Sequence, residues 1–169
     1  MRHYNPFQND EIRVLEVYYP ALMQYTRTKS DAGKPSDPDD SPFDRYIDMW
    51  FLAFCLGARE GRATEVNQNN SRRFIWGSIF ESDPHRVELL ELVALAHSGD
   101  PQILADPHRV IGLANALAAT GFPLVIDMVQ NGQSLPIWRL TDQLMELLEP
   151  DGSAEKPSEA PASNAARAS

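Results

Sequence analysis

The chain of 169 residues is long enough for one domain with its own core, and its apolar fraction of 43% is ordinary for a soluble globular protein. Its formal net charge of −9 opposes binding of DNA or acidic membranes by the surface as a whole, but is compatible with a local basic patch. The single cysteine, Cys55, excludes an internal disulfide framework and favours a reducing compartment.

The first six residues lack the apolar segment of a secretory signal, so we expect a cytoplasmic protein. After an N-terminal arm, residues 1–8, a helix is predicted from about residue 9 to residue 28. Its apolar stripe consists of Ile12, Leu15, Tyr19, Leu22 and Thr26. Pro20 interrupts this stripe, so the helix either kinks there or gives way to a second helix with Pro20 in its first turn. Residues 29–41 read as a polar loop.

The segment 42–58 is predicted to be the central helix of the core. Ser41 can cap it and Pro42 fits its first turn. The run Met49–Ala58 carries no charge, and a helix that is apolar all round is buried on every side. It is shorter than the roughly 20 apolar residues that span a bilayer. We therefore expect Trp50 and Phe54 to be buried, and Cys55 to be a core residue and not a nucleophile.

A polar connection over residues 59–73 leads to an aromatic segment, residues 74–80. This segment fits either an extended strand or a helical turn, and we favour an extended one. The pentapeptide Asp83–Val87 then recurs as Asp106–Val110. In each copy, Asp can cap a helix and Pro can fill its first position.

The first of these two helices is predicted to end near Gly99 and the second at Gly121. Residues 123–130 suit a further short helix, although a strand is also compatible. Ser134 is expected to cap a last helix, whose apolar face consists of Ile137, Leu140, Leu144 and Leu147. Residues 149–169 are expected to be a disordered tail, because Ala, Ser, Pro and Glu dominate there.

No motif in the chain points to catalysis. The two Asp-Pro-His sequences are better explained as helix caps than as zinc ligands. Asp37–Asp40 lacks the glycine and the closing glutamate of a calcium-binding loop. A phosphate-binding glycine loop and a nucleophile elbow are both missing. We expect no catalytic residue, no cofactor and no metal.

Four arginines close together in the sequence form the candidate contact site: Arg59, Arg62, Arg72 and Arg73. Only Glu60 and Glu65 oppose them, so they could form a positive patch that binds phosphates or an acidic partner surface. The alternative is a solvated loop in which Arg59 and Arg62 offset the dipole of the preceding helix.

The order of features from Phe43 to about Leu148 resembles the small bacterial family called DNA phosphorothioation-associated protein 4. Phe43–Met49 leads into Phe51–Gly57 like the opening helix of that family. Leu90–Asp100 looks like its Ala-Leu-Ala-x-(Thr/Ser)-Gly-Asp signature, and Ala114–Ala118 and Gly121 also fall in familiar places. These motifs are helix-and-cap patterns, so the resemblance carries over no catalytic residue.

The resemblance implies a setting, namely systems that replace a phosphate oxygen of DNA with sulfur and restrict unmodified DNA. The residue patterns predict an all-α or nearly all-α domain over residues 9–148, with a short extended aromatic segment near residues 74–80. The resemblance thus implies a non-catalytic accessory or regulatory subunit that acts through contacts with protein partners of that system or with DNA, and with no membrane. A stand-alone DNA-binding regulator and a small enzyme with an unrecognised site are the alternatives. The sequence does not give the oligomeric state.

Overall fold

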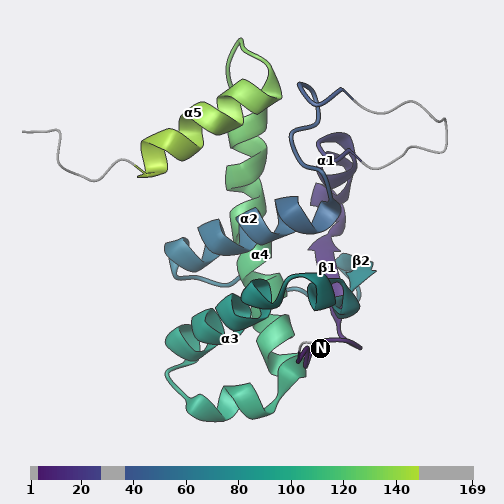
Figure 1. Ribbon diagram of the computed structural model, residues 1–169, viewed down its shortest axis with the longest axis vertical. Coiled ribbons are helices and arrows are strands. Elements are labelled where there is room, and N and C mark those ends of the chain that lie inside the picture. Colours follow the sequence, from purple (N-terminus) through teal and green to yellow (C-terminus); the bar gives the residue numbers. More distant parts are fainter. Residues whose placement is uncertain (1–3, 28–36, 149–169) are drawn as a thin grey trace, which may run out of the picture.

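The computed structural model describes residues 4–27 and 37–148 (Figure 1). Its elements in chain order are β1 (Glu11–Leu15), η1 (Glu16–Tyr18), α1 (Tyr19–Gln24), α2 (Tyr46–Glu60), β2 (Ser71–Trp76), η2 (Gly77–Ser82), α3 (Pro84–Ser98), η3 (Pro101–Ala105), α4 (Pro107–Gln130) and α5 (Pro136–Leu148), where η marks a 3-10 helix. The prediction of a nearly all-α domain is confirmed. The predicted tail, residues 149–169, and most of the predicted polar loop lie outside the described residues.

Helix α4 runs the length of the molecule, and α2 crosses it near its middle (Figure 1). The prediction that this helix ends at Gly121 is wrong, because α4 continues through Pro123 to Gln130. An interior proline removes one backbone hydrogen bond. Phe122 and Val125 on either side of it are fully buried, and their burial offsets that loss. Residues 123–130 are thus neither a separate helix nor a strand.

Helix α4 is also the only helix in the described part of the chain that is long and apolar enough to cross a membrane. Most of its apolar window is buried inside the protein. Its composition is therefore that of a core helix, which packs against the other elements on several sides.

Helix α2 begins four residues later than predicted. Arg45 and not Ser41 is its N-cap, and Asp48 accepts a hydrogen bond from the Arg45 backbone N–H at 3.1 Å. The Ser41 hydroxyl is buried and donates to the Gln24 carbonyl oxygen at 2.9 Å. Trp50 and Phe54 are fully buried and stacked, which confirms that prediction.

The apolar run of α2 is not buried on every side, because Cys55 is exposed. The prediction that Cys55 is a core residue is therefore wrong. Its two neighbours, Phe54 and Leu56, are buried, so the outer edge of α2 is the part that no other element covers.

The first predicted helix is mostly wrong, because residues 11–15 form a strand. Ile12 and Val14 are buried on one face of β1, which is the period of two of a strand. The predicted helical stripe instead combined Ile12 with Leu15, which lie on opposite faces of this strand. Pro20 lies in the first turn of α1, so the second alternative for this proline is the correct one. The predicted extended segment, residues 74–80, is correct only for its first part, which belongs to β2 (Ser71–Trp76) and pairs antiparallel with β1. Residues 77–80 belong instead to the 3-10 helix η2.

Asn115 of α4 joins this two-stranded ribbon to the helical core. Its side-chain oxygen accepts a hydrogen bond from the Arg13 backbone N–H at 2.9 Å. Its side-chain nitrogen donates to the Glu11 carbonyl oxygen at 3.0 Å. The buried side-chain amide of Asn115 thus forms hydrogen bonds with backbone groups of β1 that β2 does not pair with, as the backbone of a further strand would.

The two repeated pentapeptides start helices α3 and α4, with Pro84 and Pro107 in their first turns as predicted. Asp106 accepts a hydrogen bond from the Arg109 backbone N–H at 3.3 Å. Asp83 makes no such cap and instead pairs with the Arg86 side chain at 2.9 Å. Helix α3 ends before Gly99 as predicted, whereas α5 begins at Pro136, one residue too late for Ser134 to be its N-cap.

Candidate partner-binding surfaces

The fold separates the four arginines of the predicted patch into two pairs. Arg59 lies in the last turn of α2, and Arg62 follows directly after Gly61, which ends that helix. Arg72 and Arg73 lie in β2. In Figure 1, the last turn of α2 and the strand β2 lie on opposite sides of α4. The structure therefore does not bring all four arginines together.

Arg72 and Arg73 have partners within the ribbon. The Arg72 guanidinium donates to Glu16 at 3.1 Å and lies 4.3 Å from the centre of the Tyr19 ring. The hydrogen bond to Glu16 raises the pKa of Arg72 above its ordinary value. Arg73 donates to Glu11 at 3.2 Å and lies 4.3 Å from the centre of the Trp76 ring.

Glu11 also pairs with Arg13, which is directly opposite Arg73 in the ladder. Like charges opposite each other in a sheet are destabilising, and the shared carboxylate offsets this repulsion. The positive charge of the ribbon is thus largely neutralised. Phosphate binding by Arg72 or Arg73 would have to displace a carboxylate.

Arg59 and Arg62 are exposed and form no ion pair with any residue that the structure describes. Arg59 lies at the edge of an open groove of about 270 Å³. This groove, called the α2–α5 groove below, is lined by Leu56, Arg59, Glu60, Leu124, Met128 and Leu147. It combines an apolar floor with two charged side chains, Arg59 and Glu60. Because the Arg59 guanidinium has no partner among the described residues, an acidic group of an apolar partner segment can pair with it.

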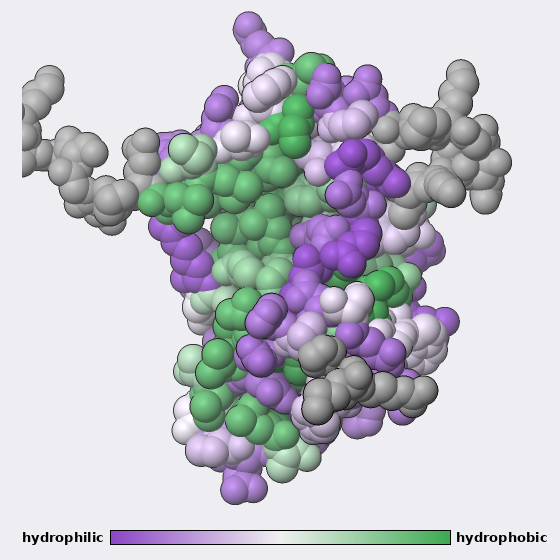
Figure 2. All heavy atoms as spheres, in the orientation of Figure 1, coloured by the Kyte–Doolittle hydropathy of each residue, from purple (hydrophilic) through white to green (hydrophobic). Residues whose placement is uncertain are grey.

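Helix α5 presents a second apolar stripe beside the one that packs on α4. Leu140 is buried, but Trp138, Met145 and Leu148 are exposed at helical spacing. Trp138 is 58% exposed and Leu148 is 78% exposed. Figure 2 shows apolar side chains in a band over the visible face, from α5 across α2 and α4 to α3. Such contiguous apolar surface marks an interaction site in a soluble protein.

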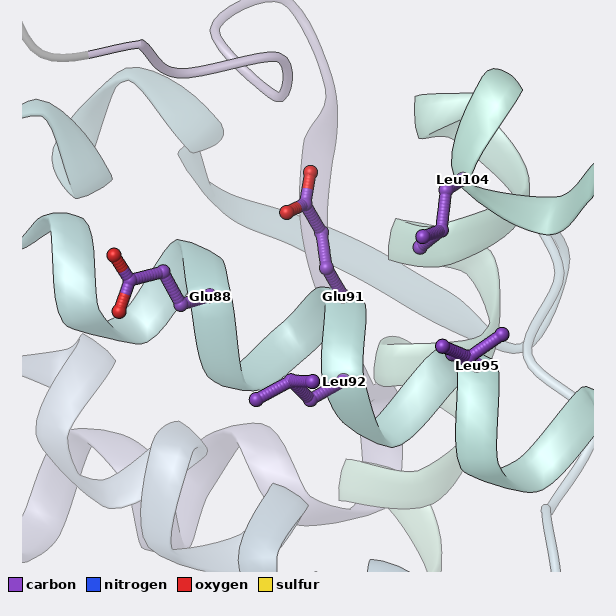
Figure 3. A pocket seen from close by; sticks show the side chains of 5 residues that line it. All are labelled: Glu88, Glu91, Leu92, Leu95 and Leu104. Atoms are coloured by element: carbon purple, nitrogen blue, oxygen red, sulfur yellow. The ribbon is translucent and has the colours of Figure 1, made fainter. Parts of the chain in front are cut away.

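A second groove, of about 300 Å³, lies between α3 and η3. This α3 groove is lined by Glu88, Glu91, Leu92, Leu95 and Leu104. Figure 3 shows the Glu88 and Glu91 carboxylates projecting from one side of α3, while Leu104 comes from η3. Leu92 is 61% exposed and Leu104 is 39% exposed.

The α3 groove was not predicted from the sequence. Val87, Leu90 and Ala94 form the buried stripe of α3, so Leu92 and Leu95 are apolar residues outside that stripe. Apolar residues on a second face of a helix were the signal that could have indicated the groove. Leu104 could not have been assigned to it without the fold.

Desolvation by burial, with a contribution from the charge of Glu88, raises the pKa of the Glu91 carboxyl. Glu88 lies 3.5 Å from the exposed His85 side chain, whereas Glu91 forms no ion pair with the described residues. The α3 groove therefore holds two carboxylates, and the positive charge of the described residues around them does not fully offset their mutual repulsion.

Within the described residues, no three His, Cys, Asp or Glu side chains gather as metal ligands would. Although Cys55 is exposed, partial burial of its thiol raises the pKa of that thiol, which makes the thiolate scarcer at neutral pH. The sequence assigned His108 no role beyond its place in an Asp-Pro-His helix start. In the structure, its side chain lies against the buried carboxylate of Asp10. This contact ties the segment before β1 to the start of α4.

The comparisons with known proteins give one match. The sequence profile of the family described as DNA sulphur modification system-associated protein 4 matches residues 33–116, about half of the chain. This is the family that the sequence resembles. The matched segment contains the whole α3 groove but only part of the α2–α5 groove. Neither curated proteins nor solved structures give a match.

Proposed function

The chain belongs to the DNA sulphur modification system-associated protein 4 family, and from this premise we propose that it is an accessory subunit of such a system. It acts by binding other proteins of the system and does not itself carry out catalysis. It works in the cytoplasm, where the DNA and its modification enzymes are found.

The observation that carries this proposal is the apolar band of Figure 2 with its two grooves. Trp138, Met145 and Leu148 on α5 and Leu92 on α3 are all exposed. Exposure of these side chains to water is unfavourable by about 25 cal/mol per Å² of apolar area. A protein partner that covers them would recover this free energy.

Arg59 and Arg62 are the two predicted site residues that support a contact most directly, because no described carboxylate neutralises them. Arg59 lies at the edge of the α2–α5 groove, where an acidic segment of a partner can pair with it, and Arg62 is exposed just beyond the end of α2. Arg72 and Arg73 belong to the site only if a partner or DNA displaces Glu16 and Glu11.

The test measures binding of the full-length protein both to duplex DNA and to the purified proteins of the system, at two salt concentrations. We expect the variant Arg59→Ala/Arg62→Ala to bind a protein partner more weakly while keeping the wild-type melting temperature. The matched control is Arg109→Ala, which removes an exposed arginine in the first turn of α4.

A direct DNA contact would instead lose affinity steeply with salt, by about 0.9 logarithmic units per phosphate for each decade of salt concentration. That result, without any protein partner, would favour a stand-alone DNA-binding regulator. If the arginine variant binds every partner as the wild type does, the two arginines are part of a solvated loop.

A further inference from the structure

The α3 groove combines an apolar floor with an acidic edge. Leu92 and Leu95 on α3 and Leu104 on η3 form the floor. Glu88 and Glu91 stand one helical turn apart on the same side of α3 (Figure 3). The edge therefore carries two negative charges beside exposed leucine side chains.

We propose that the α3 groove binds a segment of a partner protein in which a large apolar side chain is flanked by lysine or arginine. The apolar side chain would cover Leu92 and Leu104, and the basic side chains would pair with Glu88 and Glu91. The proposal rests on the proposed function, because it takes the partner to be a protein.

Charge and volume argue for this occupant. Two glutamates three residues apart on a helix repel each other, and a cation between them removes that cost. The groove volume of about 300 Å³ lies at the lower end of the range for ligand pockets, which suits one large side chain. DNA is excluded as an occupant because its phosphates would meet the two carboxylates.

The position of the groove in the chain supports the same assignment. All five lining residues lie within the segment 33–116 that matches the family. The α2–α5 groove is lined by one arginine and one glutamate, Arg59 and Glu60, and so lacks the net negative charge of the α3 groove. The two grooves therefore select different segments, and one basic apolar segment would not fill both.

The experiment uses the full-length protein and two labelled synthetic helical peptides of equal length, with fluorescence anisotropy as the readout. Both peptides carry the same leucine stripe, flanked by lysine in one and by glutamate in the other. We expect the lysine peptide to bind about tenfold more tightly, which corresponds to roughly 1.4 kcal/mol from two partly exposed charge contacts.

The variant Glu88→Gln/Glu91→Gln should lose this preference, and Leu92→Ser should weaken binding of the lysine peptide. The matched control, Asp142→Asn/Glu146→Gln, removes the same charge from exposed positions on α5 and should bind as the wild type does. Unchanged melting temperatures show that each variant is folded.

Equal binding of the two peptides, or no binding of the lysine peptide, would overturn the proposal. So would a dimer in sedimentation that Leu92→Ser dissociates, because a second copy would then cover the groove. These failures are distinct from a failure of the proposed function. If partners of the system co-purify equally well with the Glu88→Gln/Glu91→Gln variant, the accessory role stands and the groove assignment fails.

Discussion

Gly57 of α2 and Gly121 of α4 meet with their backbones in contact. A Cβ on Gly121 would lie 2.8 Å from the Gly57 amide nitrogen and 1.8 Å from the Ala53 carbonyl oxygen. A Cβ on Gly57 would lie 1.8 Å from the Leu117 carbonyl oxygen. Two helices approach this closely only where the side chains between them are missing. This crossing sets the position of α2, and with it the location of the α2–α5 groove.

We predict that Gly57→Ala destabilises the protein by about 3 kcal/mol or more, because the added methyl group meets backbone that cannot move without separating the helices. Gly112→Ala in helix α4 is the control, since nothing lies within 4 Å of the Cβ position of Gly112. It should stabilise the protein by about 0.5–1 kcal/mol through helix propensity. Denaturant unfolding measures both changes, and a Gly57→Ala variant as stable as the wild type would refute the close crossing.

A second prediction concerns Asn115, whose amide holds the edge of β1. Asn115→Leu keeps a similar volume but leaves the Arg13 N–H and the Glu11 carbonyl oxygen without this partner. We expect a loss of about 2–4 kcal/mol in stability. Hydrogen exchange should show faster exchange of the Arg13 amide. If that amide keeps its wild-type protection in the variant, Asn115 does not hold the strand.

The third prediction is a pH dependence that involves Asp48. Burial alone would raise the pKa of its carboxyl, but hydrogen bonds from Arg45 and Arg86 outweigh burial and lower that pKa. A carboxyl whose pKa is lower in the folded state stabilises the fold above its unfolded pKa of about 3.9. This stabilisation disappears as the pH falls through the folded-state pKa.

We therefore expect Asp48→Asn to lower stability by about 1–2 kcal/mol at pH 7 and to converge with the wild type in acid. Asp44→Asn is the comparison, because the side chain of Asp44 is 71% exposed and its pairing with Arg27 contributes less. Thermal unfolding from pH 7 down to pH 3 measures both variants. A constant difference across this range would show that the charge of Asp48 has no part in stability.

The sequence predicted the elements whose signals are local. Pro84 and Pro107 begin helices, Gly99 follows the end of one, and the pair Trp50 and Phe54 is buried. The sequence-based prediction failed where contacts between distant parts of the chain determine the structure. Gly121 reads as a helix end because its contact with α2 does not show in the sequence.

The same limit applies to the candidate site. Arg72 and Arg73 lie near Arg59 in the sequence, but their partners Glu11 and Glu16 come from the first strand and its extension. These long-range ion pairs neutralise Arg72 and Arg73, whereas Arg59 and Arg62 have no ion-pair partner among the described residues. In the α3 groove, Leu92 and Leu95 could be recognised as apolar residues outside the buried stripe of α3, but the position of Leu104 of η3 beside them does not show in the sequence.

Co-purification of the full-length protein from its native host tests the central claim most directly. The tagged wild-type protein is recovered at near-physiological salt, and the bound proteins are quantified by mass spectrometry against an untagged strain. We predict enrichment of proteins of the DNA sulfur-modification system, which decreases in the Arg59→Ala/Arg62→Ala variant. A wild-type protein that enriches none of them, yet binds duplex DNA with a steep salt dependence, would contradict the accessory role.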